Sequence, residues 1–130
     1  MRKAALLLVL VALGISVAVA AWADGPTPAE TAVTWTPISH VHRSSRDVRI
    51  EFGYGVCGLP ADPVSRILVS RRVHTVVITV LMRKPIIQPG EVCPALARLF
   101  KRTVSLHGRL GARSLTDGAT GHVRVRRPRH

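Results

Sequence analysis

Hydrophobic and polar residues alternate along much of the chain, which is the pattern of β-strands. The clearest case is "DVRIEFGY" (47–54), whose apolar positions all fall on one face: Val48, Ile50, Phe52 and Tyr54. Charged and small residues occupy the other face. A period of two with this division predicts a strand that buries one face and exposes the other.

The segment "VHTVVITVLM" (73–82) is apolar on both faces, which is typical of a central strand. Shorter segments predict further strands at "SRILVSRR" (65–72) and "RTVSLHG" (102–108). The stretch at 109–126 contains two turn-forming pairs, Asp-Gly and Thr-Gly, and predicts a final ribbon. Near the start, "AVTWTPISHVHR" (32–43) predicts an extended segment broken at its proline.

One segment, "CPALARLFK" (93–101), predicts a short helix. Pro94 suits the first helical turn, and Leu96, Leu99 and Phe100 share one helical face. Together these elements predict a mainly β fold, a small antiparallel β-sandwich of six or seven short strands with one short helix. An α+β arrangement is the alternative.

The N-terminus has the order of a secretory signal peptide: two basic residues, an apolar run at 4–21, and small residues Ala21 and Ala23 before Asp24. Cleavage is expected between Ala23 and Asp24. The run is close to the ~20 residues that span a bilayer, so an uncleaved anchor is the alternative. Both interpretations place the domain outside the cytoplasm. The predicted divisions are a signal peptide at 1–23, a linker at 24–31, a β-rich domain at 32–121 and a basic tail at 122–130.

Cys57 and Cys93 are the two cysteines of the chain. In an oxidising compartment such a pair is expected to form a disulfide. Closing this loop stabilises the fold by about 3–4 kcal/mol in the chain-entropy view. The alternatives are a reactive thiol at the predicted helix start and a metal ligand. An exported thiol tends to be oxidised, and two distant cysteines lack a zinc-site spacing.

The charge balance is strongly basic, with 19 Lys and Arg against 7 Asp and Glu. The C-terminal tail is the densest basic segment, and its candidate anion-binding residues are Arg124, Arg126, Arg127 and Arg129. Outside a membrane such a tail is attracted to anionic cell-wall polymers or lipid head groups. The few aromatic residues offer little stacking surface, which disfavours nucleic acid. The alternative is a solvated tail whose arginines reflect GC-rich coding.

Other candidate chemistry is sparse. His40 and His42 fall on one side of an extended segment, but their spacing supplies no third metal ligand. His107 and Asp117 are a possible pair across the final ribbon, without a placed nucleophile for hydrolysis. His74 lies in the apolar central strand, where a core or rim position is expected. We therefore predict no cofactor and no enzymatic activity.

The motifs "GYGVCGLP", "GEVCPAL" and "TVSLHGRLGARSLTDGATG" resemble small secreted proteins of actinobacteria that lack an assigned function. The resemblance covers about residues 48–121 and implies export, a disulfide and a β-rich domain. It transfers no catalytic or binding residue. The chain departs from those proteins at His107-Gly108-Arg109, where they tend to have an acidic or proline-containing step.

The function expected from the sequence is that of a non-enzymatic exported β-domain. It acts at or outside the cell envelope and binds an anionic polymer, lipid head groups or another protein. The first alternative is a protein-binding or inhibitor module that presents "GLPADP" (58–63) or "GRLGAR" (108–113). The second is a small secreted hydrolase.

Overall fold

The computed structural model describes residues 26–27 and 29–127, and this part of the chain consists of strands and loops without a helix. No helix in these ranges is long and apolar enough to span a bilayer. The predicted signal peptide, its cleavage site at Ala23–Asp24, and Arg129 lie outside the described residues. The strands are β1 (Glu30–Val33), β2 (Thr36–Pro37), β3 (Asp47–Gly55), β4 (Val64–Arg71), β5 (Thr75–Arg83), β6 (Ala97–Ser105), β7 (Ser114–Asp117) and β8 (Val123–Val125).

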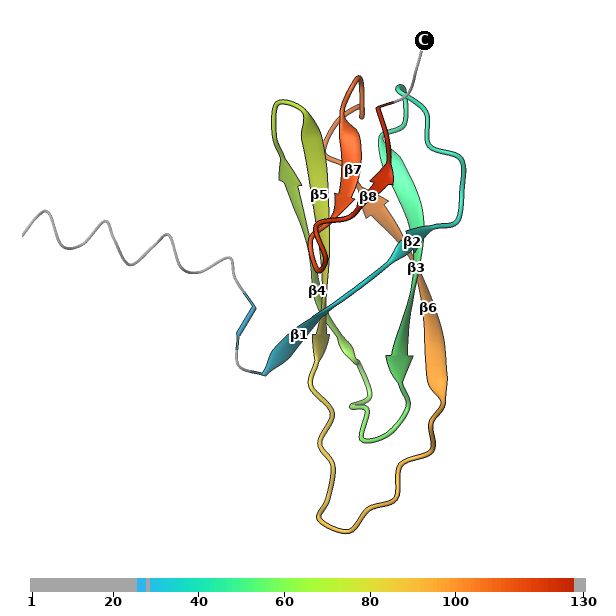
Figure 1. The fold of residues 1–130 in the computed structure, drawn as a ribbon, viewed down its shortest axis with the longest axis vertical. Coiled ribbons are helices and arrows are strands. Elements are labelled where there is room, and N and C mark those ends of the chain that lie inside the picture. Colours follow the sequence, from blue (N-terminus) through green and yellow to red (C-terminus); the bar gives the residue numbers. More distant parts are fainter. Residues whose placement is uncertain (1–25, 28, 128–130) are drawn as a thin grey trace, which may run out of the picture.

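The strands form two sheets that pack face to face (Figure 1). In the first sheet β5 is central: β4 pairs with one of its edges, and β1 and β7 share the other, with β8 beyond β7. The second sheet has the order β2-β3-β6. The predicted mainly β fold, consistent with a small β-sandwich, is confirmed, and so is the central position of the strand that is apolar on both faces. The described residues form eight strands rather than the six or seven expected, and β7 pairs with β5 in the parallel direction, so the sandwich is not wholly antiparallel.

The core lies between β3 and β5 and follows the predicted alternation. Val48, Ile50 and Phe52 are almost fully buried, and they belong to one cluster with Val76 and Ile78. Trp35, between β1 and β2, is also buried and donates its indole N–H to the Ile78 carbonyl at 2.9 Å. Because β1 belongs to the first sheet and β2 to the second, the segment around Trp35 connects the two sheets.

The predicted helix at 93–101 is wrong, because most of that segment belongs to strand β6. All nine residues of β6 pair with β3, from Ser105 opposite Asp47 to Ala97 opposite Gly55. This pairing turns Phe100 and Val104 into the core. A two-turn helix is marginal by itself, so the long-range ladder outweighs the local helical pattern.

The loops collect at the two ends of the sandwich (Figure 1). Loops 38–46, 72–74 and 106–113 lie at one end, and loops 56–63 and 84–96 lie at the other. The two ends differ in chemistry.

Candidate functional site

The first end is rich in arginine. We call it the arginine end and define it by Arg43, Arg46, Arg71, Arg72, Arg109 and Arg113. These residues lie in or beside loops 38–46, 72–74 and 106–113, which contain no acidic residue. The next acidic residue along the chain is Asp47, which begins β3 directly after Arg46. A cluster with many more positive than negative charges concentrates anions at its surface.

Backbone hydrogen bonds join two of these loops. The amides of Leu106 and Gly111 donate to the carbonyls of Arg46 and Arg43, both at 2.8 Å, and Leu110 donates to Ser45 at 2.9 Å. Leu106 and Leu110 are fully buried beneath the loop. The loop that carries Arg109 is therefore fixed to the loop that carries Arg46.

Two arginine side chains fasten the end further. Arg71 donates to the carbonyls of Leu106 at 2.7 Å and Arg109 at 2.9 Å. The Nε of Arg113 donates to the carbonyl of Arg72 at 2.9 Å. These guanidinium groups bind carbonyl oxygens rather than carboxylates, so their positive charge is not neutralised.

Three of the remaining arginines have no carboxylate partner among the described residues. Arg46, Arg72 and Arg109 are exposed, and none of them forms an ion pair with another described residue. His107 adopts a φ of 56° next to Gly108, a conformation that is uncommon for residues other than glycine. Arg109 is thus presented from a loop with a defined, unusual shape, and Arg46 and Arg72 from the two loops beside it.

The basic tail joins this end only in part. β8 runs toward the arginine end, so Arg126 and Arg127, which follow it, are exposed there (Figure 1). The third candidate, Arg124, points into the fold and pairs with Asp117 at 3.1 Å. The guanidinium of Arg124 is therefore already occupied by a carboxylate.

Asp117 is the one charged residue among the described ones that is fully buried. Its side chain accepts hydrogen bonds from Thr34 and from the amides of Trp35 at 3.3 Å and Ala119 at 2.9 Å, as well as from Arg124. Burial raises the pKa of Asp117, but these four donors outweigh it and the pKa lies below its ordinary value. The carboxylate is ionised and joins the β1–β2 crossing to the β7–β8 hairpin.

The second end contains the disulfide between Cys57 and Cys93, whose Cα atoms are 5.4 Å apart. The predicted pairing is confirmed. The bridge joins the turn after β3 to the segment before β6. The amide of Ile86 donates to the carbonyl of Gly58 at 3.0 Å, which attaches loop 84–96 to the same turn.

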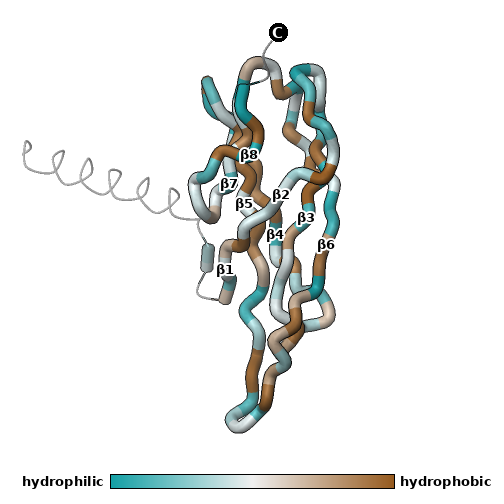
Figure 2. The backbone as a smooth tube through the Cα atoms, turned by 45° about the vertical axis from the view of Figure 1, so that its right-hand side comes forward, coloured by the Kyte–Doolittle hydropathy of each residue, from teal (hydrophilic) through white to brown (hydrophobic). Residues whose placement is uncertain are grey.

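Aliphatic side chains are exposed around this disulfide. Figure 2 shows hydrophobic stretches on both limbs of the long loop between β5 and β6. We call this cluster the aliphatic end; it consists of Ile86, Ile87, Val92 and Leu96, which are 52–91% exposed. A shallow pocket beside the disulfide is lined by Ile87, Leu96 and Tyr54. An exposed apolar cluster of this kind is a common feature of interaction surfaces.

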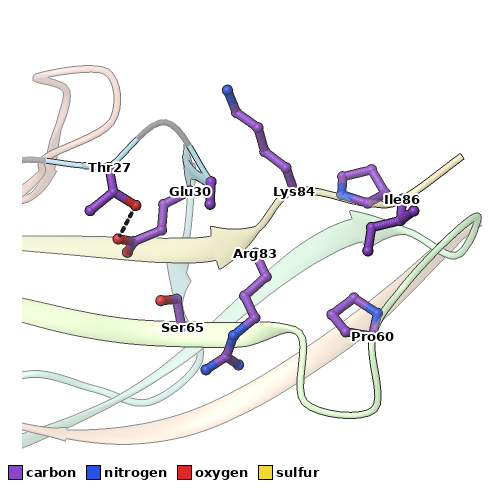
Figure 3. Close-up of a pocket in the computed structure, with 9 residues that line it drawn as sticks. Thr27, Glu30, Pro60, Ser65, Arg83, Lys84 and Ile86 are labelled. Atoms are coloured by element: carbon purple, nitrogen blue, oxygen red, sulfur yellow. Dashed lines mark hydrogen bonds between the residues drawn. The ribbon is translucent and has the colours of Figure 1, made fainter.

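A cleft of about 480 Å³ lies between the start of β1 and the end of β5 (Figure 3). Glu30 on its wall accepts hydrogen bonds from Arg66 at 3.0 Å and from Thr27 at 2.8 Å. These bonds, with the Arg66 bond the larger cause, lower the pKa of Glu30 to about 2. Lys84 points away from Glu30 in this view. The carboxylate fastens β1 to β4 and is not a free general base.

The histidines are not arranged as a metal site in the described part of the chain. The rings of His40 and His42 lie 6.1 Å apart, and no group of three His, Cys, Asp or Glu residues there is arranged to hold a metal. The described partners of Asp117 do not include His107. Neither His107 nor His74 lines any of five pockets found among the described residues.

Comparison with known proteins finds no match to a family model, to a curated protein or to a solved structure. The arginine end was not predicted from the sequence, because its residues come from three loops that are far apart along the chain. These arginines can be recognised as one cluster only when the strand topology is known, because alternate turns of a β-sandwich lie at the same end.

Proposed function

We propose that the protein is a non-enzymatic, exported β-domain that binds an anionic polymer of the cell envelope through the arginine end. The observation that carries the proposal is the set of six arginines from three loops, held together by backbone and guanidinium–carbonyl hydrogen bonds. The disulfide supports export, because such bonds persist in oxidising compartments.

Arginine suits this role for a chemical reason. Its planar guanidinium donates paired hydrogen bonds to phosphate and carboxylate groups and stays charged at any physiological pH. Because Arg71 and Arg113 already fix the loops, binding costs less conformational entropy than on a flexible segment. The segment after β8, which contains the exposed Arg126 and Arg127, lies at the same end of the sandwich and adds positive charge there (Figure 1).

The proposal is tested by measuring the affinity of the full chain for inorganic polyphosphate, used as the anionic probe. The variant Arg46→Gln/Arg72→Gln/Arg109→Gln is expected to bind at least about tenfold more weakly at low salt. A matched control, Arg49→Gln/Lys84→Gln/Arg98→Gln, removes the same charge elsewhere and should change the affinity by less than about threefold. An equal loss in both variants, or binding that salt does not weaken, contradicts the proposal.

A second candidate function, a protein-binding module, is favoured by the aliphatic end. Ile86, Ile87 and Val92 are exposed beside a disulfide that holds their loop in place. A photo-crosslinking residue at Ile87 should give one discrete adduct with envelope proteins, whereas the same residue at Ser70 should give none. Diffuse or equal labelling at both positions rejects this candidate.

A further inference from the structure

Strand β6 has an unpaired edge along its whole length. It pairs with β3 on one side, and no described strand lies on the other side (Figure 1). β4 also borders a sheet, but an irregularity between Val64 and Arg66 interrupts its ladder, and β8 has only three residues. Among the described strands, β6 therefore offers the longest regular edge. Such an edge can accept another extended chain.

The backbone groups that face outward can be assigned from the ladder. At its two ends, Val56 donates to Leu96 at 3.2 Å and Leu106 donates to Arg46 at 2.8 Å. In an antiparallel ladder the bonded pairs recur at every second residue. The even-numbered residues of β6 therefore bond to β3. The amides and carbonyls of the odd-numbered residues Leu99, Lys101 and Thr103 face the free edge.

The side chains of β6 add positive charge to this edge. Arg98 stacks over the ring of Phe100 at 5.0 Å, and Lys101 has one acidic neighbour, Glu51, at 3.8 Å. Arg102 donates at 2.9 Å to the carbonyl of Lys101, which faces outward. A carboxylate on an incoming chain can accept the Arg102 hydrogen bond instead. The Lys101 carbonyl is then released for pairing with that chain.

These charges also indicate which occupant fits. Pairing of β6 with β6 of a second copy brings Arg98, Lys101 and Arg102 against the same cations, which is unfavourable. An acidic chain has the opposite effect, since its carboxylates can face Arg98 and Arg102, which share one face of β6, while its backbone completes the ladder. Leu99, which is 63% exposed, offers a contact for an apolar side chain on the same strand.

We propose that β6 binds an extended acidic peptide segment as an additional antiparallel strand. The outward-facing backbone groups of Leu99, Lys101 and Thr103 supply the ladder once Arg102 releases the Lys101 carbonyl, and Arg98 and Arg102 select for acidic side chains. This site is separate from the arginine end, and it requires a backbone that can form strand hydrogen bonds, which polyphosphate lacks.

The probe is a terminally blocked peptide that alternates glutamate and valine, labelled for fluorescence anisotropy and titrated with the full chain. We expect saturable binding and amide chemical-shift changes concentrated at Leu99, Lys101 and Thr103. The same peptide with its three central amides N-methylated lacks N–H donors on both edges of its central segment and should bind at least about tenfold more weakly. Equal binding of the two peptides overturns the proposal.

Protein variants provide an independent test. Thr103→Pro removes an amide that faces the free edge and no bond to β3, so the fold is expected to persist and the affinity to fall at least about tenfold. Thr103→Ala is the matched control and should bind within about threefold of the original chain. If Thr103→Pro does not fold, the N-methylated peptide with the unaltered chain still decides the question.

The peptide site and the polymer site are distinguished by exchanging variants. Arg98→Gln/Arg102→Gln should weaken peptide binding and leave polyphosphate binding within about threefold of the original. Arg46→Gln/Arg72→Gln/Arg109→Gln should do the reverse. Loss of peptide binding in that second variant overturns this inference, because the peptide then binds as a general polyanion. A dimer formed through β6 in sedimentation also overturns it.

Discussion

Replacement of the buried Asp117 by alanine should destabilise the fold more than any other single removal of a charge. The carboxylate has no exposed surface and accepts four hydrogen bonds, one of them from Arg124. Asp117→Ala leaves the guanidinium of Arg124 and the amides of Trp35 and Ala119 without this acceptor. Removing one partner of a buried pair costs about 3–5 kcal/mol.

The structure places the expected loss near the lower end of that range. The Arg124 side chain is 23% exposed, so water can solvate part of the guanidinium once the carboxylate is gone. We therefore expect about 3 kcal/mol for Asp117→Ala, a large share of the 5–15 kcal/mol typical of a domain. Arg124→Ala should cost less, about 1–2 kcal/mol, because Asp117 keeps its three other donors.

The assay is urea unfolding at neutral pH with the disulfide intact, followed by tryptophan fluorescence. The buried Trp35 is expected to report the transition. Asp62→Ala removes an exposed carboxylate and is the control, with an expected change within about 0.5 kcal/mol. The reasoning is refuted if Arg124→Ala destabilises as much as Asp117→Ala, or if Asp117→Ala costs no more than the control.

Three further predictions concern stability. The pKa of Glu30 is lowered to about 2, so its carboxylate stabilises the fold above pH 4.5, and this stabilisation is lost as the pH falls toward 2. Glu30→Gln should therefore flatten the pH dependence of the free energy of unfolding in that window. An unchanged profile contradicts the role of Arg66. Cys57→Ser/Cys93→Ser should lower the free energy of unfolding by about 3–4 kcal/mol in chemical denaturation, whereas a loss below about 1 kcal/mol argues against the loop-closure effect. Gly118→Ala places a Cβ atom 1.8 Å from a threonine oxygen on β5 and should lower the free energy of unfolding by about 2 kcal/mol, measured by thermal unfolding. An unchanged melting temperature contradicts this, because β5 then moves aside without loss of stability.

Much of the fold could be predicted from local pattern. The alternation at Val48, Ile50 and Phe52 and the two apolar faces of 73–82 correctly indicate β3 and the central β5. A strand can be identified from its period of two because this alternation is visible in residues that are neighbours along the chain. It does not report which strand pairs with which.

The errors and omissions concern long-range contacts. At 93–101 the local spacing indicates a helix, but pairing with β3 turns Phe100 and Val104 into the core. Arg124 looks like a free cation of the tail until the fold brings it to Asp117, seven positions away across a hairpin. The arginine end likewise depends on three loops meeting in space.

The most direct test of the proposed polymer-binding function is a nuclear magnetic resonance titration of the full chain with polyphosphate, observing arginine Nε–H signals. The largest shifts are expected at Arg46, Arg72 and Arg109, and they should diminish steeply as salt is added. Shifts confined to Arg126 and Arg127, or spread evenly over all arginines, contradict a binding site at the arginine end.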